Sequence, residues 1–141
     1  MLLLDVNVVL ATHRADHPHH DQARAWFNAV LAEGADFGVP AAVWASFLRI
    51  STNRRIFSVP TSLSEAFDFI EAVRLQPGHV PIEPADRHFT LLRQVAEEAE
   101  ALGDLVPDAV LAAVAREAGA RIATFDRDFA RFEGVDTVRP A

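Results

Sequence analysis

Three aspartates stand where the sequence pattern predicts the ends of structural elements. Asp5 directly follows the apolar run Leu2–Leu4, and Asp126 comes after a similar run near the other end of the chain. Such positions lie at the carboxyl edge of a parallel α/β sheet, where these folds bind ligands. Asp108 follows Pro107 at the start of an alanine-rich stretch that predicts a helix. Carboxylates gathered at strand and helix ends are the oxygen ligands of hard divalent cations, so the spacing predicts a metal-dependent enzyme.

Two uncharged side chains accompany these acids. Asn7 stands two positions after Asp5, so we expect its amide on the same side of the chain, where it can orient a metal-bound water or a phosphate. By the same alternation Thr124 and Asp126 share a side, which favours Asp126 as the site acid and Thr124 as a hydroxyl that assists it. Asp128 is the other acid of this segment, and the pattern leaves its role open.

Each acid also has a purely structural interpretation. A polar residue after a buried strand is common turn chemistry, which would account for Asp5. An acid in the first turn of a helix stabilises the helix dipole, which would account for Asp108. One acid of the pair Asp126 and Asp128 is expected to cap a short helix. The small, apolar helix after Asp108 must pack closely, which favours a carboxylate fixed at the sheet edge. Asp104 is assigned as a cap or an exposed acid.

The composition restricts the chemistry that the chain can perform. It has 141 residues, 50% of them hydrophobic, and we expect one domain over residues 1–141 with a sizeable core. Without cysteine there are no disulfides, thiolate zinc sites or cysteine nucleophiles, which suits a reducing cytoplasm. All 13 basic residues are arginine, which excludes the lysine-dependent haloacid-dehalogenase phosphatases, receiver domains and P-loop enzymes. The net charge of −7 argues against binding of nucleic acid by bulk electrostatics.

Strands alternate with helices along the chain, which predicts an α/β fold with a mainly parallel sheet covered by helices on both faces. Residues 1–4 lack a basic flank and are too short for a signal peptide or a membrane span, so we expect a buried strand there. Residues 79–82 include proline and predict an irregular strand. The expected strands are 2–6, 36–40, 79–82, 121–124 and 135–138, and the expected helices are 7–13, 20–33, 41–52, 65–75, 84–102, 107–117 and 127–132.

Four segments, taken in order, resemble the PIN-domain family and in particular its VapC-type toxins. They are Leu-Leu-Leu-Asp-Val-Asn at 2–7, Val-Trp-Ala-Ser-Phe-Leu-Arg-Ile at 43–50, Asp-Ala-Val-Leu-Ala-Ala at 108–113 and Thr-Phe-Asp-Arg-Asp-Phe at 124–129. Each segment alone has low specificity, but the ordered set covers essentially the whole chain. The resemblance implies a three-layer α/β/α fold and an endoribonuclease that depends on Mg²⁺ or Mn²⁺.

Carried onto this sequence, the resemblance assigns Asp5, Asp108 and Asp126 as metal ligands. It implies hydrolysis of RNA by metal-activated water, which leaves a 3′-hydroxyl and a 5′-phosphate. It also implies the toxin half of a type II toxin–antitoxin pair that acts as a homodimer, while the lack of cysteine and of a signal peptide or membrane span leads us to expect a cytoplasmic protein without membrane association. Its partner would be a VapB-type antitoxin whose arginines occupy the acidic cleft. The residues that would position the water or a phosphate oxygen are Asn7, Ser46 and Thr124.

The main departure from the family pattern is Ser46. The family usually has a glutamate there, three residues before the arginine of the same helix, which is Arg49 in this chain. One carboxylate fewer should weaken metal binding and removes a base that could orient water, unless Asp104 or Asp128 replaces it. A catalytically degenerate PIN domain that binds antitoxin or RNA is therefore the alternative function. A DNA nuclease of flap type is a third hypothesis, which the short, acidic chain disfavours.

Other polar and aromatic clusters allow two interpretations each. Arg49, Arg54 and Arg55 are either a solvated helix end or donors to RNA phosphates beside the metal. The histidines between residues 13 and 20 lack the spacing and the cysteines of a zinc site, which favours a polar loop and a helix start. Helical spacing favours core or dimer-interface positions for the aromatic residues Trp26, Phe27, Trp44 and Phe47.

Overall fold

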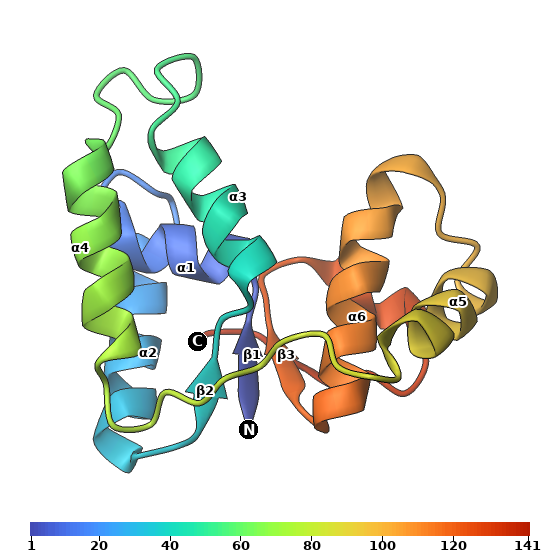
Figure 1. Ribbon diagram of the computed structural model, residues 1–141. Coiled ribbons are helices and arrows are strands. Elements are labelled where there is room, and N and C mark those ends of the chain that lie inside the picture. The colour runs from blue at the N-terminus through green and yellow to red at the C-terminus, as the bar shows by residue number, and fades with distance from the viewer.

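The computed structural model describes all 141 residues and is built around a parallel sheet (Figure 1). The strand order is β2 (Phe37–Gly38), β1 (Leu2–Leu4), β3 (Arg121–Ala123) and β4 (Thr137–Val138). All pairings in the sheet are parallel, so the carboxyl ends of the strands share one edge. β1 and β3 are neighbours although they stand near opposite ends of the sequence, and the segments that follow them therefore lie close together.

Helices cover both faces of this sheet, and the predicted three-layer α/β/α fold is confirmed. In Figure 1 the helices α1 to α4 stand on one side of the sheet, and α5 and α6 stand on the other. No helix has both the length and the apolar character needed to cross a membrane. The helices are α1 (Val6–His13), α2 (His20–Glu33), α3 (Ala41–Ser51), α4 (Leu63–Arg74), α5 (His88–Glu98) and α6 (Val106–Ala118), with two 3₁₀ turns, η1 (Gly103–Leu105) and η2 (Arg127–Arg131).

The core lies between the central strands and the inner faces of the helices. Leu3 of β1 and Ile122 of β3 are completely buried, and so are Ala112 and Ala113 of α6. Small side chains allow α6 to pack closely, as its alanine-rich sequence predicted. The expected aromatic core residues Phe27, Trp44 and Phe47 are buried, and Trp26 is partly buried.

The third expected strand, at 79–82, is wrong. A single parallel bridge joins His79 to Phe37, and the N–H of Val80 donates to the Phe37 carbonyl at 2.7 Å. Pro81 then has no N–H with which to continue the ladder, so pairing stops there. The sheet consequently has four strands, and residues 79–82 run beside β2 as irregular chain.

The helix expected at 84–102 is shorter than predicted, because α5 begins only at His88. The carboxylate of Glu117, near the end of α6, accepts the peptide N–H groups of Ala85 and Arg87 at 2.9 and 2.7 Å. These contacts fix the preceding residues in a turn, and their partner lies about 30 positions further along the chain. The other predicted helices agree with the structure to within a few residues.

Candidate active site

The two strands that precede predicted site acids end side by side. Leu4 of β1 pairs with Ala123 of β3, and the peptide N–H of Asp5 donates to the Ala123 carbonyl at 3.0 Å. Thr124 follows β3 directly and donates its own N–H to the carbonyl of Val138 in β4. Asp5 and Thr124 therefore leave neighbouring strands at the carboxyl edge of the sheet, where ligands bind in folds of this class.

The hydroxyl of Thr124 joins the side chains at this edge. It donates to Oδ2 of Asp5 at 2.7 Å, and it accepts hydrogen bonds from Nδ2 of Asn7 at 3.2 Å and from the peptide N–H of Asp126 at 3.0 Å. The residue is almost fully buried, with 3% of its surface exposed. Because its donor and both acceptor positions are engaged within the protein, Thr124 positions the two acids relative to each other.

Asn7, in the first turn of α1, forms hydrogen bonds with the same residues and with the segment that follows β3. Its Nδ2 also donates to Oδ2 of Asp5 at 3.2 Å, and its Oδ1 accepts the peptide N–H of Phe125 at 3.1 Å. Both amide hydrogens are thus used within the protein, which leaves only a lone pair of Oδ1 for a water molecule. The contacts of Asn7 give it a positioning role, and its direct contact with water or phosphate stays a prediction.

Asp5 combines the structural and the chemical interpretations proposed for it. Its Oδ1 accepts the peptide N–H of Val6 at 2.7 Å, so the side chain caps α1. Burial raises the pKa of Asp5 above its usual value, since only 7% of the residue is exposed. Hydrogen bonds from Thr124 and Val6 lower this pKa, whereas the negative charge of Asp126 raises it, and burial dominates.

Asp108 lies in the first turn of α6, as its sequence position predicted, and is partly buried. Loss of hydration, followed by the negative charges of Asp5, Asp126 and Asp128, raises the pKa of Asp108 to about 6. Only the cationic Arg131 opposes this shift. The three neighbouring acids outweigh this one cation, and the predicted site acids therefore form an electrostatically coupled cluster.

The segment after β3 does contain a helix cap, and the cap is Asp126. Its Oδ1 accepts the peptide N–H of Asp128 at 2.8 Å and begins η2. The expectation that one acid of this pair caps a helix is confirmed, but the cap and the predicted site acid are the same residue. Asp128 is exposed and contributes its charge to the raised pKa of Asp108. Asp104 is also exposed, in η1.

The donor set of this cluster suits a hard divalent cation. Asp5, Asp108 and Asp126 offer carboxylate oxygens, and a positive charge among them would offset the repulsion that raises the pKa of Asp108. No group of three His, Cys, Asp or Glu side chains lies close enough to hold an ion by itself. Mg²⁺ is commonly held by one or two carboxylates together with water and substrate phosphates, so an open acidic cluster fits its chemistry.

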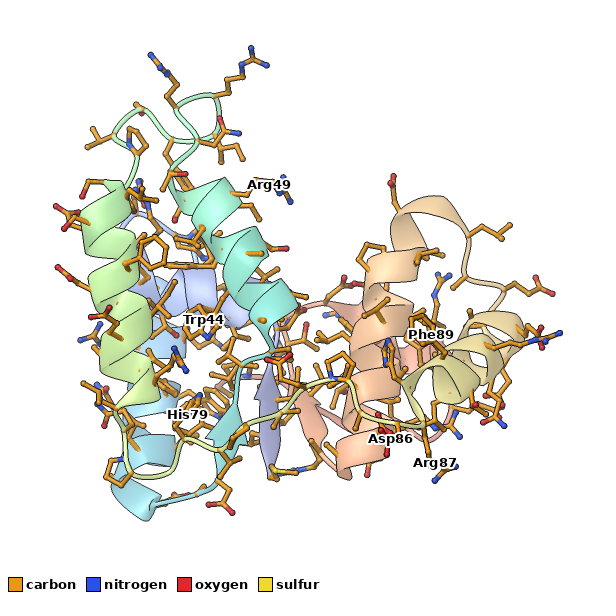
Figure 2. All side chains as sticks on the ribbon, viewed as in Figure 1. Trp44, Arg49, His79, Asp86, Arg87 and Phe89 are labelled. Carbon is orange, nitrogen blue, oxygen red and sulfur yellow. The ribbon has the colours of Figure 1, made fainter.

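The remaining predicted site residues lie outside this network. Ser46, on α3, is partly buried, and its hydroxyl makes no hydrogen bond. Arg49 is exposed on the same helix, and Figure 2 shows its side chain extending from α3 toward the side where α6 stands. Arg54 and Arg55 are exposed in the loop between α3 and α4 and form no ion pair. All three arginines are therefore available to a polyanion.

The histidines between residues 13 and 20 lie at the end of α1, in the loop that follows and at the start of α2. This placement agrees with the interpretation of a polar loop and a helix start. A ring nitrogen of His13 lies 3.1 Å from the Thr61 hydroxyl, and Nδ1 of His20 lies 2.8 Å from the carbonyl oxygen of Ala11. Both rings therefore tie this loop to the rest of the protein.

Three residues beside the acidic cluster were not predicted from the sequence. Phe125 stands between Thr124 and Asp126, and its ring stacks on the imidazole of His19 with centroids 4.5 Å apart. Arg139 donates to the carbonyl of Phe125 at 2.8 Å. The only sequence feature that could have indicated a role for Phe125 is its position between two predicted site residues. His19 comes from a distant part of the chain and Arg139 stands 14 positions after Phe125, and both contacts could be identified only from the fold.

Comparisons with known proteins connect this arrangement with one family. The family model described as PIN domain matches residues 2–135. Ribonuclease VapC25 of Mycobacterium tuberculosis is 54% identical over 140 residues, and Ribonuclease VapC31 of the same species is 55% identical, each match covering 99% of both chains. A solved structure of VapBC2 from Rickettsia felis, bound to a DNA fragment from their promoter, matches with a TM-score of 0.72. That match covers 98% of this chain and 97% of the other at 13% identity, and it shows a shared fold.

Proposed function

The chain belongs to the PIN-domain family, and from this premise we propose that it is an endoribonuclease and the toxin of a type II toxin–antitoxin pair. The observation that carries the proposal is the acidic cluster of Asp5, directly after β1, Asp108, in the first turn of α6, and Asp126, in the segment after β3. Two relatives of the same length, both named ribonucleases, support the assignment of RNA as the substrate.

We propose that Asp5, Asp108 and Asp126 hold Mg²⁺ or Mn²⁺. Such an ion, when bound, lowers the pKa of a water molecule and neutralises negative charge on the attacked phosphate. The raised pKa of Asp108 supports this assignment, because a protein gains stability when a cation relieves repulsion between clustered carboxylates. Because Mg²⁺ is commonly held by one or two carboxylates together with water and substrate phosphates, the three acids need not all contact the ion directly.

The other residues of the cluster have positioning tasks in this proposal. Thr124 and Asn7 keep the Asp5 carboxylate in one orientation, and Thr124 also fixes the peptide N–H of Asp126. Ser46 offers a hydroxyl without a protein partner, which suits a contact with the attacking water or a phosphate oxygen. The water adds to phosphorus, the P–O3′ bond breaks, and the released 3′-oxygen takes up a proton. The products are a 5′-phosphate and a 3′-hydroxyl.

RNA binding is assigned to the exposed arginines. Arg49, Arg54 and Arg55 have no acidic partner within the chain, and a guanidinium can donate two parallel hydrogen bonds to one phosphate. Their local charge can hold a polyanion even though the net charge of the chain is −7.

We further propose that residues 1–141 form a single PIN-like domain, which works in the cytoplasm as a homodimer. Besides its own second copy, it binds a VapB-type antitoxin whose arginine side chains lie against the acidic cluster. The negative net charge of the chain supports a basic partner of this kind.

The alternative is a degenerate PIN domain that binds RNA or antitoxin without cutting. Ser46 favours it, because a glutamate is usual at this position in the family, and so does the absence of a group of three acids close enough to hold an ion. The names of the relatives favour the enzyme. The presence or absence of metal-dependent cleavage separates the two functions.

The decisive experiment maps 5′ ends in total bacterial RNA after incubation with the purified protein in Mn²⁺, Mg²⁺ or EDTA. We expect discrete new 5′-phosphate ends with either metal and none with EDTA or with Asp5→Asn. The variant should fold with some loss of stability: asparagine keeps an oxygen that can cap α1 and removes a buried charge, but its Nδ2 replaces the oxygen that accepts from Thr124 and Asn7. Circular dichroism checks this fold, and growth arrest on expression checks toxicity. Cleavage by Asp5→Asn would contradict the role of Asp5, and no cleavage by the parent chain would favour the binding module.

A further inference from the structure

The peptide segment between Thr124 and Asp126 is held from both sides. The N–H of Phe125 donates to Oδ1 of Asn7 at 3.1 Å, and its carbonyl accepts a hydrogen bond from Arg139 at 2.8 Å. Phe125 itself has no group that could take part in hydrolysis. Its backbone is nevertheless the link between the hydroxyl that orders the network and the carboxylate of Asp126.

The ring of Phe125 is held as well. The imidazole of His19 stacks on it with 4.5 Å between centroids and 16° between planes, and the guanidinium carbon of Arg139 lies 5.1 Å from its centroid. Stacked and cation–π contacts of this kind contribute about 0.5–1.5 kcal/mol each. Phe125 is partly buried and therefore depends on these contacts to stay in place.

His19 is well placed to act as a fixed surface for this ring. Its carbonyl accepts the N–H of Ala23 at 2.9 Å, and its own N–H donates to Nδ1 of His17 at 3.0 Å, so its backbone is tied to α2 and to the preceding loop. Its ring makes no side-chain hydrogen bond, and it lies against Phe125 and, at 5.8 Å, against His17. The ring therefore packs against Phe125 and does not cap α2 through a side-chain hydrogen bond.

We propose that His19 and Arg139 are positioning residues of the ribonuclease reaction, which act through Phe125 to hold Thr124 and Asp126 in place. The inference rests on the proposed function of the same site. Thr124 and Asp126 leave a strand that ends at Ala123, and chain beyond a strand end is mobile unless it is tied down. A shift of about 1 Å in a catalytic group can cost as much as a hundredfold in rate.

The test compares steady-state cleavage of an RNA substrate by His19→Ala, His19→Phe and Arg139→Ala. We expect His19→Ala and Arg139→Ala to lower kcat about tenfold with little change in KM, since they displace the reacting groups and not the bound RNA. His19→Phe should retain activity within about twofold of the parent chain, because a flat ring restores the stacking. His79→Ala is the control, since His79 also packs against a phenylalanine, Phe37, but away from the site.

Amide hydrogen exchange gives a second measurement that needs neither RNA nor metal. The N–H groups of Phe125 and Asp126 should exchange about tenfold faster in His19→Ala than in the parent chain. Unchanged kcat in both alanine variants, or unchanged exchange at these two amides, would overturn the proposal. Failure of His19→Phe to restore activity would also overturn it, because the imidazole would then have a role other than stacking. If the parent chain cuts no RNA, the proposed ribonuclease function is wrong. The exchange measurement still shows in that case whether His19 holds the segment of Phe125 and Asp126 in place.

Discussion

The hydroxyl of Thr124 donates to the Asp5 carboxylate at 2.7 Å and joins two residues that are 119 positions apart in the sequence. Both residues are buried, with 3% and 7% of their surfaces exposed. A buried carboxylate requires hydrogen-bond donors, and a buried hydroxyl requires partners for its own donor and acceptor positions. The parallel pairing of β1 with β3 satisfies both requirements at once and thereby fixes the orientation of a predicted metal ligand.

Thr124→Val should destabilise the protein and abolish most cleavage. The substitution keeps the shape of the side chain, but it leaves one amide hydrogen of Asn7 and the N–H of Asp126 without their acceptor, and it removes a donor to Asp5. Unsatisfied buried groups of this kind cost about 1–3 kcal/mol. Chemical denaturation measures the loss of stability, and RNA cleavage measures the loss of activity. Thr124→Ser keeps the hydroxyl and should retain most of both. A fully active Thr124→Val would refute the positioning role.

Asp108 should reduce stability at neutral pH when no cation is present. Its pKa of about 6 lies above the ordinary value of 3.8, so between these pH values the folded state binds more protons than the unfolded state. The free energy of unfolding therefore falls as pH rises through this window. Asp108→Asn should remove that loss and raise Tm at pH 7 by roughly 3 °C, from about 1 kcal/mol after allowance for solvent screening.

Thermal unfolding at pH 4 and pH 7, with and without Mg²⁺, checks this prediction. Added Mg²⁺ should raise the Tm of the parent chain at pH 7 more than that of Asp108→Asn, because the ion replaces the lost proton as the compensating charge. A Tm of Asp108→Asn below that of the parent chain at pH 7 would show that the charged carboxylate stabilises the fold and would contradict the electrostatic account.

The sequence was sufficient for the layers of the fold and for the locations of the acids, because both follow from local patterns. Apolar runs that end in an acid predict strand ends, and proline followed by a small-residue stretch predicts the start of α6. The strand at 79–82 was predicted wrongly because one prolyl nitrogen ends its pairing. The start of α5 was predicted too early because Glu117, far along the chain, takes the N–H groups of two residues before it.

The contacts within the site could be predicted only in part, since they depend on register between distant segments. Alternation along the chain placed Asn7 near Asp5, but it could not show that both amide hydrogens of Asn7 are engaged within the protein. The cap at Asp126 was expected for one of two acids, and only the backbone geometry of η2 distinguishes them. The stacking of His19 on Phe125 has no local sequence signal, because more than 100 residues separate the two rings.

Ser46→Glu should raise the affinity for Mn²⁺ at least about tenfold, because it adds a carboxylate at the position where the family usually carries one. Isothermal titration with Mn²⁺ in the absence of RNA measures the change, and Ser46→Gln is the control, with a similar size and no charge. Unchanged affinity in Ser46→Glu would mean that an acid such as Asp128 already supplies the missing ligand. A gain in both affinity and cleavage would identify Ser46 as the cause of a weakened site.

Removal of the two loop arginines, Arg54→Ala combined with Arg55→Ala, should weaken RNA binding and leave the chemical step intact. Each phosphate contact that is lost reduces the slope of log Kd against log salt by about 0.7 for single-stranded RNA, so KM should rise while kcat stays within about twofold. The control combines Arg24→Ala with Arg121→Ala, which removes the same charge from exposed positions on α2 and β3. Equal losses of RNA affinity in the two double variants would assign the effect to net charge. A loss of affinity confined to the loop variant, with a reduced salt slope, requires direct contacts between this loop and the RNA backbone.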